Sequence, residues 1–183
     1  MFKPENIQYI LTTSKGKSLN IFYREGQGIT LSMLNRRNRW TPPQVLVKKC
    51  LPFFSATLDL NDDIHMFYQN DRGDLIYLKH THGSWQKNEV LKGKQPSTRN
   101  KYPWIVCKKS TVHLFYMLRY QGRNLLSWQQ TDIQGNISQP KVLDYIVNDH
   151  CFEILEADQG IYVAYNADRQ NGEGGYRHFD LEQ

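Results

Sequence analysis

The segment Ile64-His65-Met66-Phe67-Tyr68 decides the fold, because similar segments recur at regular intervals along the chain. Each is an apolar run that ends in tyrosine, and the four runs are Ser18–Tyr23, Asp63–Tyr68, Thr111–Tyr116 and Gly160–Tyr165. Their closing tyrosines are 45, 48 and 49 residues apart. A nearly constant period in this range indicates a repeat architecture, in which each repeat is one supersecondary unit.

Other strand-like segments surround each run in the same order. An apolar segment precedes the run across a short polar turn, a second follows it, and in the first three repeats a third ends in a Val-Leu pair. The preceding segments are 8–11, 53–58, 104–107 and 152–155, the following ones are 29–34, 75–80, 125–130 and 176–181, and the third ones are 40–46, 85–91 and 137–143. Because glycine, asparagine and aspartate in the turns suit tight reversals, neighbouring strands should be antiparallel.

These patterns predict an all-β fold in a single domain over 1–183, a β-propeller of about four blades. Each blade would be a four-stranded antiparallel repeat of about 47 residues, and the last would lack an obvious fourth strand. The predicted repeats are approximately 5–49, 50–100, 101–148 and 149–183. An immunoglobulin-like sandwich is the main rival fold, but it would not repeat its sequence at this period. Whether the ring closes within one chain, or is an arc completed by a second copy or by further chain, stays open.

The repeats resemble the blades of sialidase-like and fucose-lectin-like β-propellers. The shared features are a hydrophobic-Phe-Tyr strand, a turn with glycine, a second apolar strand, and tryptophan before the outer strand, seen here as Met66-Phe67-Tyr68, Gly73, Leu75-Ile76-Tyr77 and Trp85. The resemblance implies the propeller architecture. It carries over no activity, because the sialidase turn motif and its acid, tyrosine and triple-arginine set have no counterpart here, and one fold hosts many functions.

Composition narrows the class of protein. The formal net charge is +5, which favours an acidic partner without requiring one. The three cysteines have no pattern typical of a disulfide framework or a zinc site, so we expect no metal and no cofactor. The chain starts without the apolar run of a signal peptide and contains no stretch long enough to span a bilayer. These features predict a cytoplasmic protein that is not held in a membrane.

The turns that follow the tyrosine-ended strands are the first candidate for binding. Each carries arginine beside glycine, and strand alternation brings these turns to the same face as the lysine-rich connections between repeats. The candidate arginines are Arg24, Arg72, Arg119, Arg123 and Arg169. Guanidinium groups bind carboxylates and phosphates through paired hydrogen bonds, so the predicted ligand is anionic. The alternative is that these are ordinary solvated turn residues, partly neutralised by acidic neighbours.

Aromatic side chains are the second candidate, because their faces stack on sugar rings. Tyr102 and Trp104 lie near the start of an inner strand, and Tyr120 lies in one of the arginine turns. Trp40 and Trp85 occupy equivalent repeat positions, which favours structural packing for both. The repeat-equivalent histidines His65 and His113 are expected to be buried and hydrogen-bonded. We predict no catalytic residue, because no catalytic motif is present.

The leading functional hypothesis is a non-enzymatic, lectin-like module that binds carbohydrate, with acidic glycans as one class of ligand, through one face. The alternative is a protein-protein interaction scaffold that recognises an acidic protein segment. A glycoside hydrolase of sialidase-like fold ranks below both. The modest charge and the absence of a known nucleic-acid motif argue against nucleic acid as a partner.

Overall fold

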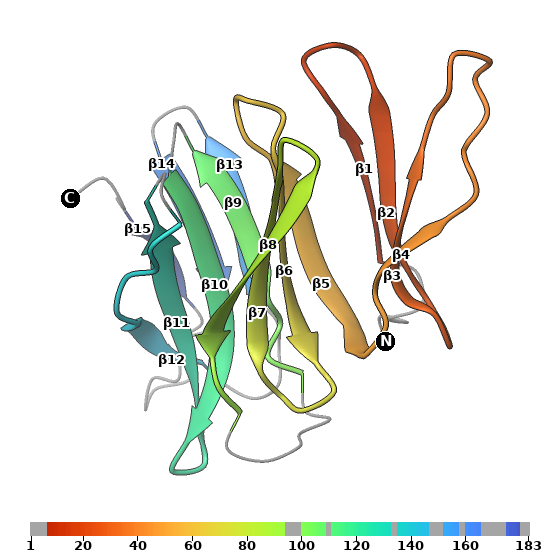
Figure 1. Cartoon of the computed structure of the whole chain (residues 1–183). Helices are drawn as coiled ribbons and strands as arrows, with labels where there is room; N and C mark the ends of the chain where they lie inside the picture. The colour runs from red at the N-terminus through yellow and green to blue at the C-terminus, as the bar shows by residue number, and fades with distance from the viewer. Residues whose placement is uncertain are drawn as a thin grey trace.

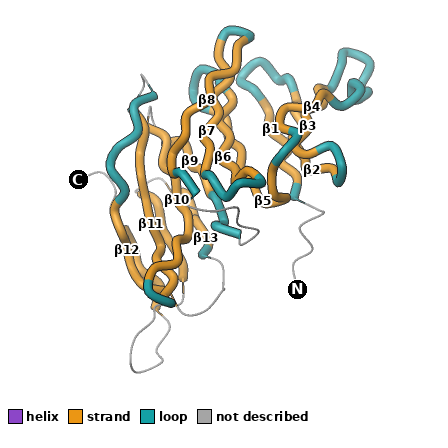
Figure 2. The backbone as a smooth tube through the Cα atoms, turned by 60° about the horizontal axis from the view of Figure 1, so that its bottom comes forward, coloured by secondary structure: helices purple, strands orange, loops and turns teal. Residues whose placement is uncertain are grey.

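The computed structural model describes residues 7–93, 100–108, 111–132, 135–146, 152–157 and 160–165, and the backbone of 175–179. These residues form fifteen strands in four antiparallel sheets (Figures 1 and 2). Within each sheet the strands pair in chain order. The all-β prediction and the count of four repeated sheets are therefore confirmed.

Each sheet lies within one of the predicted repeats. Sheet 1 contains β1 (Gln8–Thr12), β2 (Ser18–Arg24), β3 (Gly28–Met33) and β4 (Gln44–Val47); sheet 2 contains β5 (Cys50–Leu58), β6 (Ile64–Asn70), β7 (Leu75–Thr81) and β8 (Ser84–Leu91). Sheet 3 contains β9 (Trp104–Lys108), β10 (Thr111–Tyr120), β11 (Arg123–Thr131) and β12 (Lys141–Ile146); sheet 4 contains β13 (Glu153–Ala157), β14 (Gly160–Tyr165) and β15 (Gly175–Phe179). The described part of the last repeat thus has three strands, as its sequence predicted.

The tyrosine-ended runs form the second strand of every sheet, and side chains alternate between the two sides of such a strand. We call the side that carries Tyr23, Tyr68, Tyr116 or Tyr165 the tyrosine side, and the opposite side, which carries Phe22, Phe67, Phe115 or Ala164, the phenylalanine side. In β6 the residues Ile64 to Gln69 are all buried, because sheet 2 is covered on both sides. Coverage on both sides explains why this run is continuously apolar instead of alternating.

Hydrophobic clusters join consecutive sheets. The phenylalanine side of sheet 2, with Phe67 and Tyr77, packs on the tyrosine side of sheet 3. The phenylalanine side of sheet 3, with Phe115 and Trp128, packs in the same way on the tyrosine side of sheet 4. Sheets 2, 3 and 4 therefore stack as successive blades do, each using opposite sides for its two neighbours.

Sheet 1 packs differently. Leu19 and Ile21, on its tyrosine side, join a cluster with Met66 and Tyr68, which lie on the tyrosine side of sheet 2. Among the described residues, no hydrophobic cluster connects sheet 4 with sheet 1. Sheet 1 therefore does not pack on sheet 2 as one blade of a ring packs on the next. The described strands form a stack of four sheets with three interfaces, and no closed propeller is seen.

A β-bulge recurs where the third and fourth strands of sheets 1 to 3 pair. In each case the register skips one residue of the fourth strand, and the skipped residues are Leu46, Val90 and Leu143. All three pack against the intersheet clusters. A bulge re-aims a side chain that regular pleating would direct elsewhere. The repeated Val-Leu pair of the sequence therefore marks a bulge that supplies one extra apolar residue to the core.

Candidate functional site

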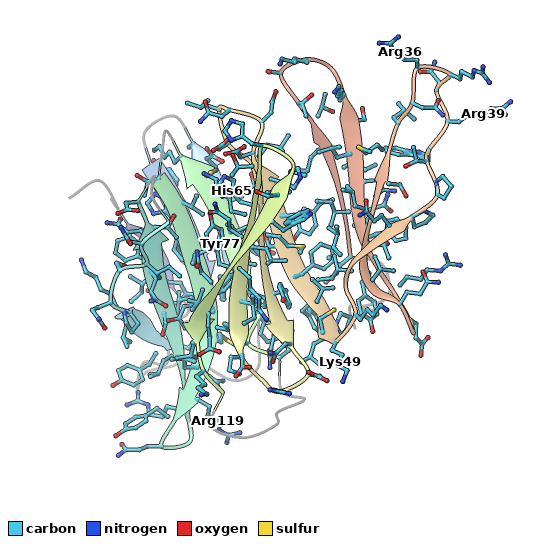
Figure 3. All side chains as sticks on the ribbon, viewed as in Figure 1. Arg36, Arg39, Lys49, His65, Tyr77 and Arg119 are labelled. Atoms are coloured by element: carbon cyan, nitrogen blue, oxygen red, sulfur yellow. The ribbon has the colours of Figure 1, made fainter. Side chains whose placement is uncertain are left out.

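The arginine-bearing turns lie at one end of the stack, which we call the arginine end and define by Arg24, Arg72, Arg119 and Arg123. Figure 3 shows Arg119 of sheet 3 and Lys49, from the connection between sheets 1 and 2, at this end. It shows Arg36 and Arg39 at the opposite end. The predicted gathering of basic turns and connections at one end therefore agrees with the placement of Arg119 and Lys49.

Two of the predicted residues come together in sheet 3. Tyr120 ends β10 and pairs with Arg123, the first residue of β11, so both side chains lie on the same side of the hairpin. The guanidinium carbon of Arg123 lies 4.0 Å from the centre of the Tyr145 ring on β12. Tyr120 is 62% exposed and Tyr145 is 40% exposed. We call these three residues the Tyr120 cluster.

A tight hairpin turn creates the Tyr120 cluster. Gln121 and Gly122, the two residues between β10 and β11, have φ angles of 48° and 80°. Positive φ at both central positions is typical of a type I′ turn, whose twist matches that of the flanking strands. The turn therefore holds Tyr120 and Arg123 directly across from each other at the tip of two long strands.

Asp144 fixes the third member of the cluster. Its carboxylate accepts a hydrogen bond of 2.8 Å from the backbone N–H of Tyr145, and another of 2.8 Å from the hydroxyl of Tyr165 in sheet 4. The backbone that carries the Tyr145 ring is thus tied to two sheets. Sequence reasoning missed Tyr145, because only the pairing of β11 with β12 places it next to Arg123.

The chemistry of the Tyr120 cluster suits a flat, polar and anionic ligand. Tyr120 is a large amphipathic ring that remains accessible, and stacking on Tyr145 orients the Arg123 guanidinium. A ligand carboxylate or sulfate could bind the guanidinium edge while an apolar ring face contacts tyrosine. The residues that end β2 and β6, the strands equivalent to β10, are Arg24 and Asn70 in place of Tyr120, so this combination occurs in sheet 3 alone among the described turns.

The other predicted arginines do not join the cluster. Arg119 pairs with Asn124 and lies on the opposite side of the same hairpin. Arg72 is exposed in the β6–β7 turn of sheet 2, and Arg24 is exposed at the end of β2 in sheet 1. Arg169 lies outside the described residues. Arg24, Arg72 and Arg119 contribute positive charge to the arginine end and do not form one binding pocket with Arg123.

The two remaining aromatic candidates are packed. The Tyr102 ring makes an edge contact with Phe53 at 5.5 Å between centroids, and Tyr102 also packs against the cluster between sheets 3 and 4. Trp104 pairs with Phe115 and packs against the same cluster. Because both rings are partly buried by structural contacts, they offer less surface to a ligand than Tyr120 does.

Lys101, one of the basic connection residues, ties sheets 2 and 3 together. Its side chain donates to the carbonyl of Gly73, and its backbone N–H donates to the Gln69 side chain at 2.8 Å. Its carbonyl accepts from the backbone N–H of Met117 at 2.7 Å. Burial lowers the pKa of Lys101, and the carboxylate of Asp74 opposes that effect. Lys101 is therefore a structural cation.

The repeat-equivalent histidines are buried and hydrogen-bonded, as predicted. Nδ1 of His65 lies 2.6 Å from the Tyr77 hydroxyl, and Nε2 lies 3.2 Å from the Asp59 carboxylate. In sheet 3 the indole N–H of Trp128 donates to Nδ1 of His113 at 3.2 Å. No group of three or more histidine, cysteine or acidic side chains suited to a metal ion occurs in the described part of the chain. Nor does that part contain a helix long and apolar enough to cross a membrane.

Comparison with known proteins adds evidence on the fold. No protein-family model matches the sequence, and no curated protein matches it. Among solved structures, the chain is similar to the BP39L lectin from Burkholderia pseudomallei, with a TM-score of 0.58 and 10% sequence identity. The match covers 89% of this chain and 51% of the lectin chain, so this chain spans about half of the lectin's length. At this identity the likeness supports the architecture alone.

Proposed function

We propose that this chain is a lectin-like module that binds carbohydrate without converting it, with acidic sugars as the preferred class, through the arginine end. The observation that carries the proposal is the Tyr120 cluster, where an exposed tyrosine lies beside a guanidinium held 4.0 Å from a second ring. The solved structure that the chain resembles is a lectin, which is consistent with the same class of ligand.

In the proposed complex, the Tyr120 ring and the Arg123 guanidinium contact different parts of the sugar. The Tyr120 face packs on the apolar face of a sugar ring, and Arg123 binds a carboxylate or sulfate on that sugar. Arg72 and Arg119 lie outside the cluster and raise the positive potential at the same end, which speeds and strengthens the binding of an anion. Affinity should therefore fall as salt is added, because exposed charges are screened.

A glycan array tests this proposal, with the purified chain applied at low and at physiological salt. We expect salt-sensitive binding to acidic glycans. Tyr120→Ala should weaken binding to the best glycan at least fivefold, because the lost ring contact is worth roughly 1 kcal/mol. Arg123→Gln should remove the preference for acidic over neutral sugars. Arg72→Glu and Arg119→Glu should weaken binding further through the reversed potential.

Lys15→Gln is the matched control, because Lys15 is an exposed cation in the β1–β2 turn, at the other end of the strands. It should leave glycan binding unchanged. Salt-insensitive binding to neutral sugars would restrict the site to the tyrosines and remove the role of Arg123. If the folded chain, with a β-type circular dichroism spectrum, binds no glycan on the array, the carbohydrate proposal is wrong and a protein-interaction scaffold is favoured.

A further inference from the structure

A second basic surface lies at the end of sheet 1 opposite the arginine end. The connection between β3 and β4 carries Arg36, Arg37 and Arg39, all exposed, followed by Trp40. Figure 3 shows Arg36 and Arg39 extending from this connection, far from Arg119. We call residues Asn35 to Trp40 the Arg36 loop.

Hydrogen bonds give the Arg36 loop a defined shape. The side-chain oxygen of Asn35 accepts from the backbone N–H groups of Arg37 and Arg39, at 2.9 and 3.1 Å. The backbone of Asn35 also bonds to Asn38 and Arg39, and Asn38 adopts a left-handed φ of 55°. The three arginines therefore project from an ordered turn, which lowers the entropic cost of holding a ligand.

The local charge is stronger than the overall charge suggests. Residues 26–58 contain five lysines and arginines and no aspartate or glutamate; three of the five lie in the Arg36 loop, and Lys48 and Lys49 lie in the connection to sheet 2. The Lys79–Asp63 ion pair and the His65–Asp59 contact both belong to sheet 2. The net charge of +5 for the whole chain thus conceals a segment that is purely basic.

Trp40 departs from its repeat-equivalent tryptophan. The Trp85 ring lies 4.7 Å from the His80 ring and packs against the cluster between sheets 1 and 2. Trp40 instead is 43% exposed, and it pairs with Leu34 across the base of the Arg36 loop. The prediction that both tryptophans serve packing holds for Trp85, whereas Trp40 stays partly exposed and directly follows the three arginines in the chain.

We propose that the Arg36 loop binds single-stranded nucleic acid. Three guanidinium groups neutralise backbone phosphates, and the Trp40 indole stacks on one base, a combination found where proteins hold single strands without reading sequence. An acidic peptide would supply anions and would leave the accessible indole without a flat aromatic partner, and a sulfated glycan is distinguished by the heparin comparison below. The Arg36 loop and the Tyr120 cluster lie at opposite ends of the molecule. A test of nucleic-acid binding at the loop is therefore independent of the carbohydrate proposal.

The first experiment measures binding of the full chain to a fluorescent deoxyuridine oligomer, called oligouridine below, and to an abasic deoxyribose-phosphate oligomer of equal length. Both probes carry the same phosphates, and only the first offers bases. We expect the oligouridine to bind about 5- to 160-fold more tightly, the range that corresponds to one stacked base at about 1–3 kcal/mol. With three phosphates neutralised, the slope of log K against log salt should be about −2 for the single strand.

Variants assign the effect to the loop. Trp40→Leu should reduce the preference for oligouridine over the abasic probe to less than about twofold, and Trp40→Phe should retain part of it. The triple change Arg36→Gln, Arg37→Gln and Arg39→Gln should flatten the salt slope for both probes. A matched control removes three exposed cations near the arginine end of the same sheet, with Arg24→Gln, Lys48→Gln and Lys49→Gln, and should leave the preference for oligouridine intact.

Three results would overturn the proposal. Equal affinity for oligouridine and the abasic probe would mean that no base is stacked. Tighter binding to heparin or to polyglutamate than to oligouridine would assign the loop to another class of polyanion. An unchanged oligouridine affinity in the triple arginine variant, with its fold confirmed by circular dichroism, would place any nucleic-acid binding elsewhere.

Discussion

Two buried histidines, His65 and His113, occupy equivalent positions in their repeats but have different hydrogen-bond partners. Each stacks on an aromatic ring of the adjacent strand, His65 on Tyr77 and His113 on Trp128, with ring centroids 5.9 Å apart in both pairs. His65 hydrogen-bonds to the hydroxyl of Tyr77, whereas His113 accepts a hydrogen bond from the indole N–H of Trp128. Nδ1 of His113 must therefore be unprotonated. His113 should therefore resist protonation.

Acid should destabilise the protein through His113. Burial, helped by the positive charge of Lys108, lowers the pKa of His113 to about 4 from an ordinary 6.5. Because the folded pKa lies below the unfolded one, the unfolded chain binds the proton first. Stability is then complete above pH 6.5 and falls as the pH drops toward 4, by at most about 1.4 kcal/mol per pH unit. His65, whose pKa burial also lowers, contributes in the same direction.

Urea unfolding at pH 7 and pH 5 measures this effect. His113→Asn keeps an acceptor for the Trp128 N–H and cannot titrate, so its stability should depend less on pH in this window than that of the unaltered chain. An identical pH dependence in the two proteins would mean that His113 is not the titrating group.

Gly28 should be intolerant of any side chain. Its φ is 86°, and a Cβ at this position would overlap the carbonyl oxygen of Val47. Gly26, two residues earlier, has a φ of 75° with open space around the same position. Gly28→Ala should therefore cost more than about 3 kcal/mol, whereas Gly26→Ala should cost only the left-handed strain of about 1 kcal/mol. Thermal unfolding of both variants would show equal losses if the Val47 carbonyl can move aside.

At the scale of the element, the repeated bulge directs one side chain of a short outer strand into the hydrophobic core. Val142 and Leu143 are neighbours in β12, but Val142 is 54% exposed whereas Leu143 packs against the cluster between sheets 3 and 4. In a regular strand, side chains alternate between the two sides of the sheet, so the pairing register alone would decide whether Val142 or Leu143 faced the core. In β12 the Val-Leu pair therefore carries one core residue, and the register decides which one.

Alanine substitutions in β12 test this assignment. Leu143→Ala should destabilise the protein by about 1–3 kcal/mol, because it removes buried methyl groups, whereas Val142→Ala should change stability by less than about 0.5 kcal/mol. The measurement is the free energy of unfolding in urea. A larger loss for Val142→Ala would mean that β12 pairs in a different register in solution.

At the scale of the whole molecule, the four sheets differ in how much of their surface is covered. Sheets 2 and 3 pack on both sides, and sheets 1 and 4 pack on their tyrosine sides. Ile10 on sheet 1 and Leu155 on sheet 4, both on phenylalanine sides, are 63% and 59% exposed. Such a stack resembles a linear array, in which stability depends on nearest-neighbour interfaces and is lowest at the ends.

Amide hydrogen exchange should reveal this gradient. We expect the slowest exchange in β6 and β10, the second strands of the doubly covered sheets, and exchange at least about tenfold faster in β2 and β14, which hold the same position in the end sheets. Uniform protection across the four strands would instead indicate that something covers the phenylalanine sides of sheets 1 and 4 in solution, as completion of a ring by a second copy or by further chain would do.

The sequence alone determined the repeated unit. The tyrosine period, the glycine-containing turns and the Val-Leu pairs are local signals, because hairpin pairing joins segments close in the chain. The same reasoning identified Tyr120 and Arg123 as candidates, since a guanidinium and an aromatic ring lie in one of the repeated turns. The tertiary structure decided which sides of the sheets meet, and neither the packing of sheet 1 through its tyrosine side nor the exposure of Trp40 is visible in the repeat. The hydrophobic effect is non-directional, so an apolar side of a sheet can pack against any other apolar side. The sequence shows that both sides of a sheet are apolar. Only the tertiary structure shows which side meets which neighbour.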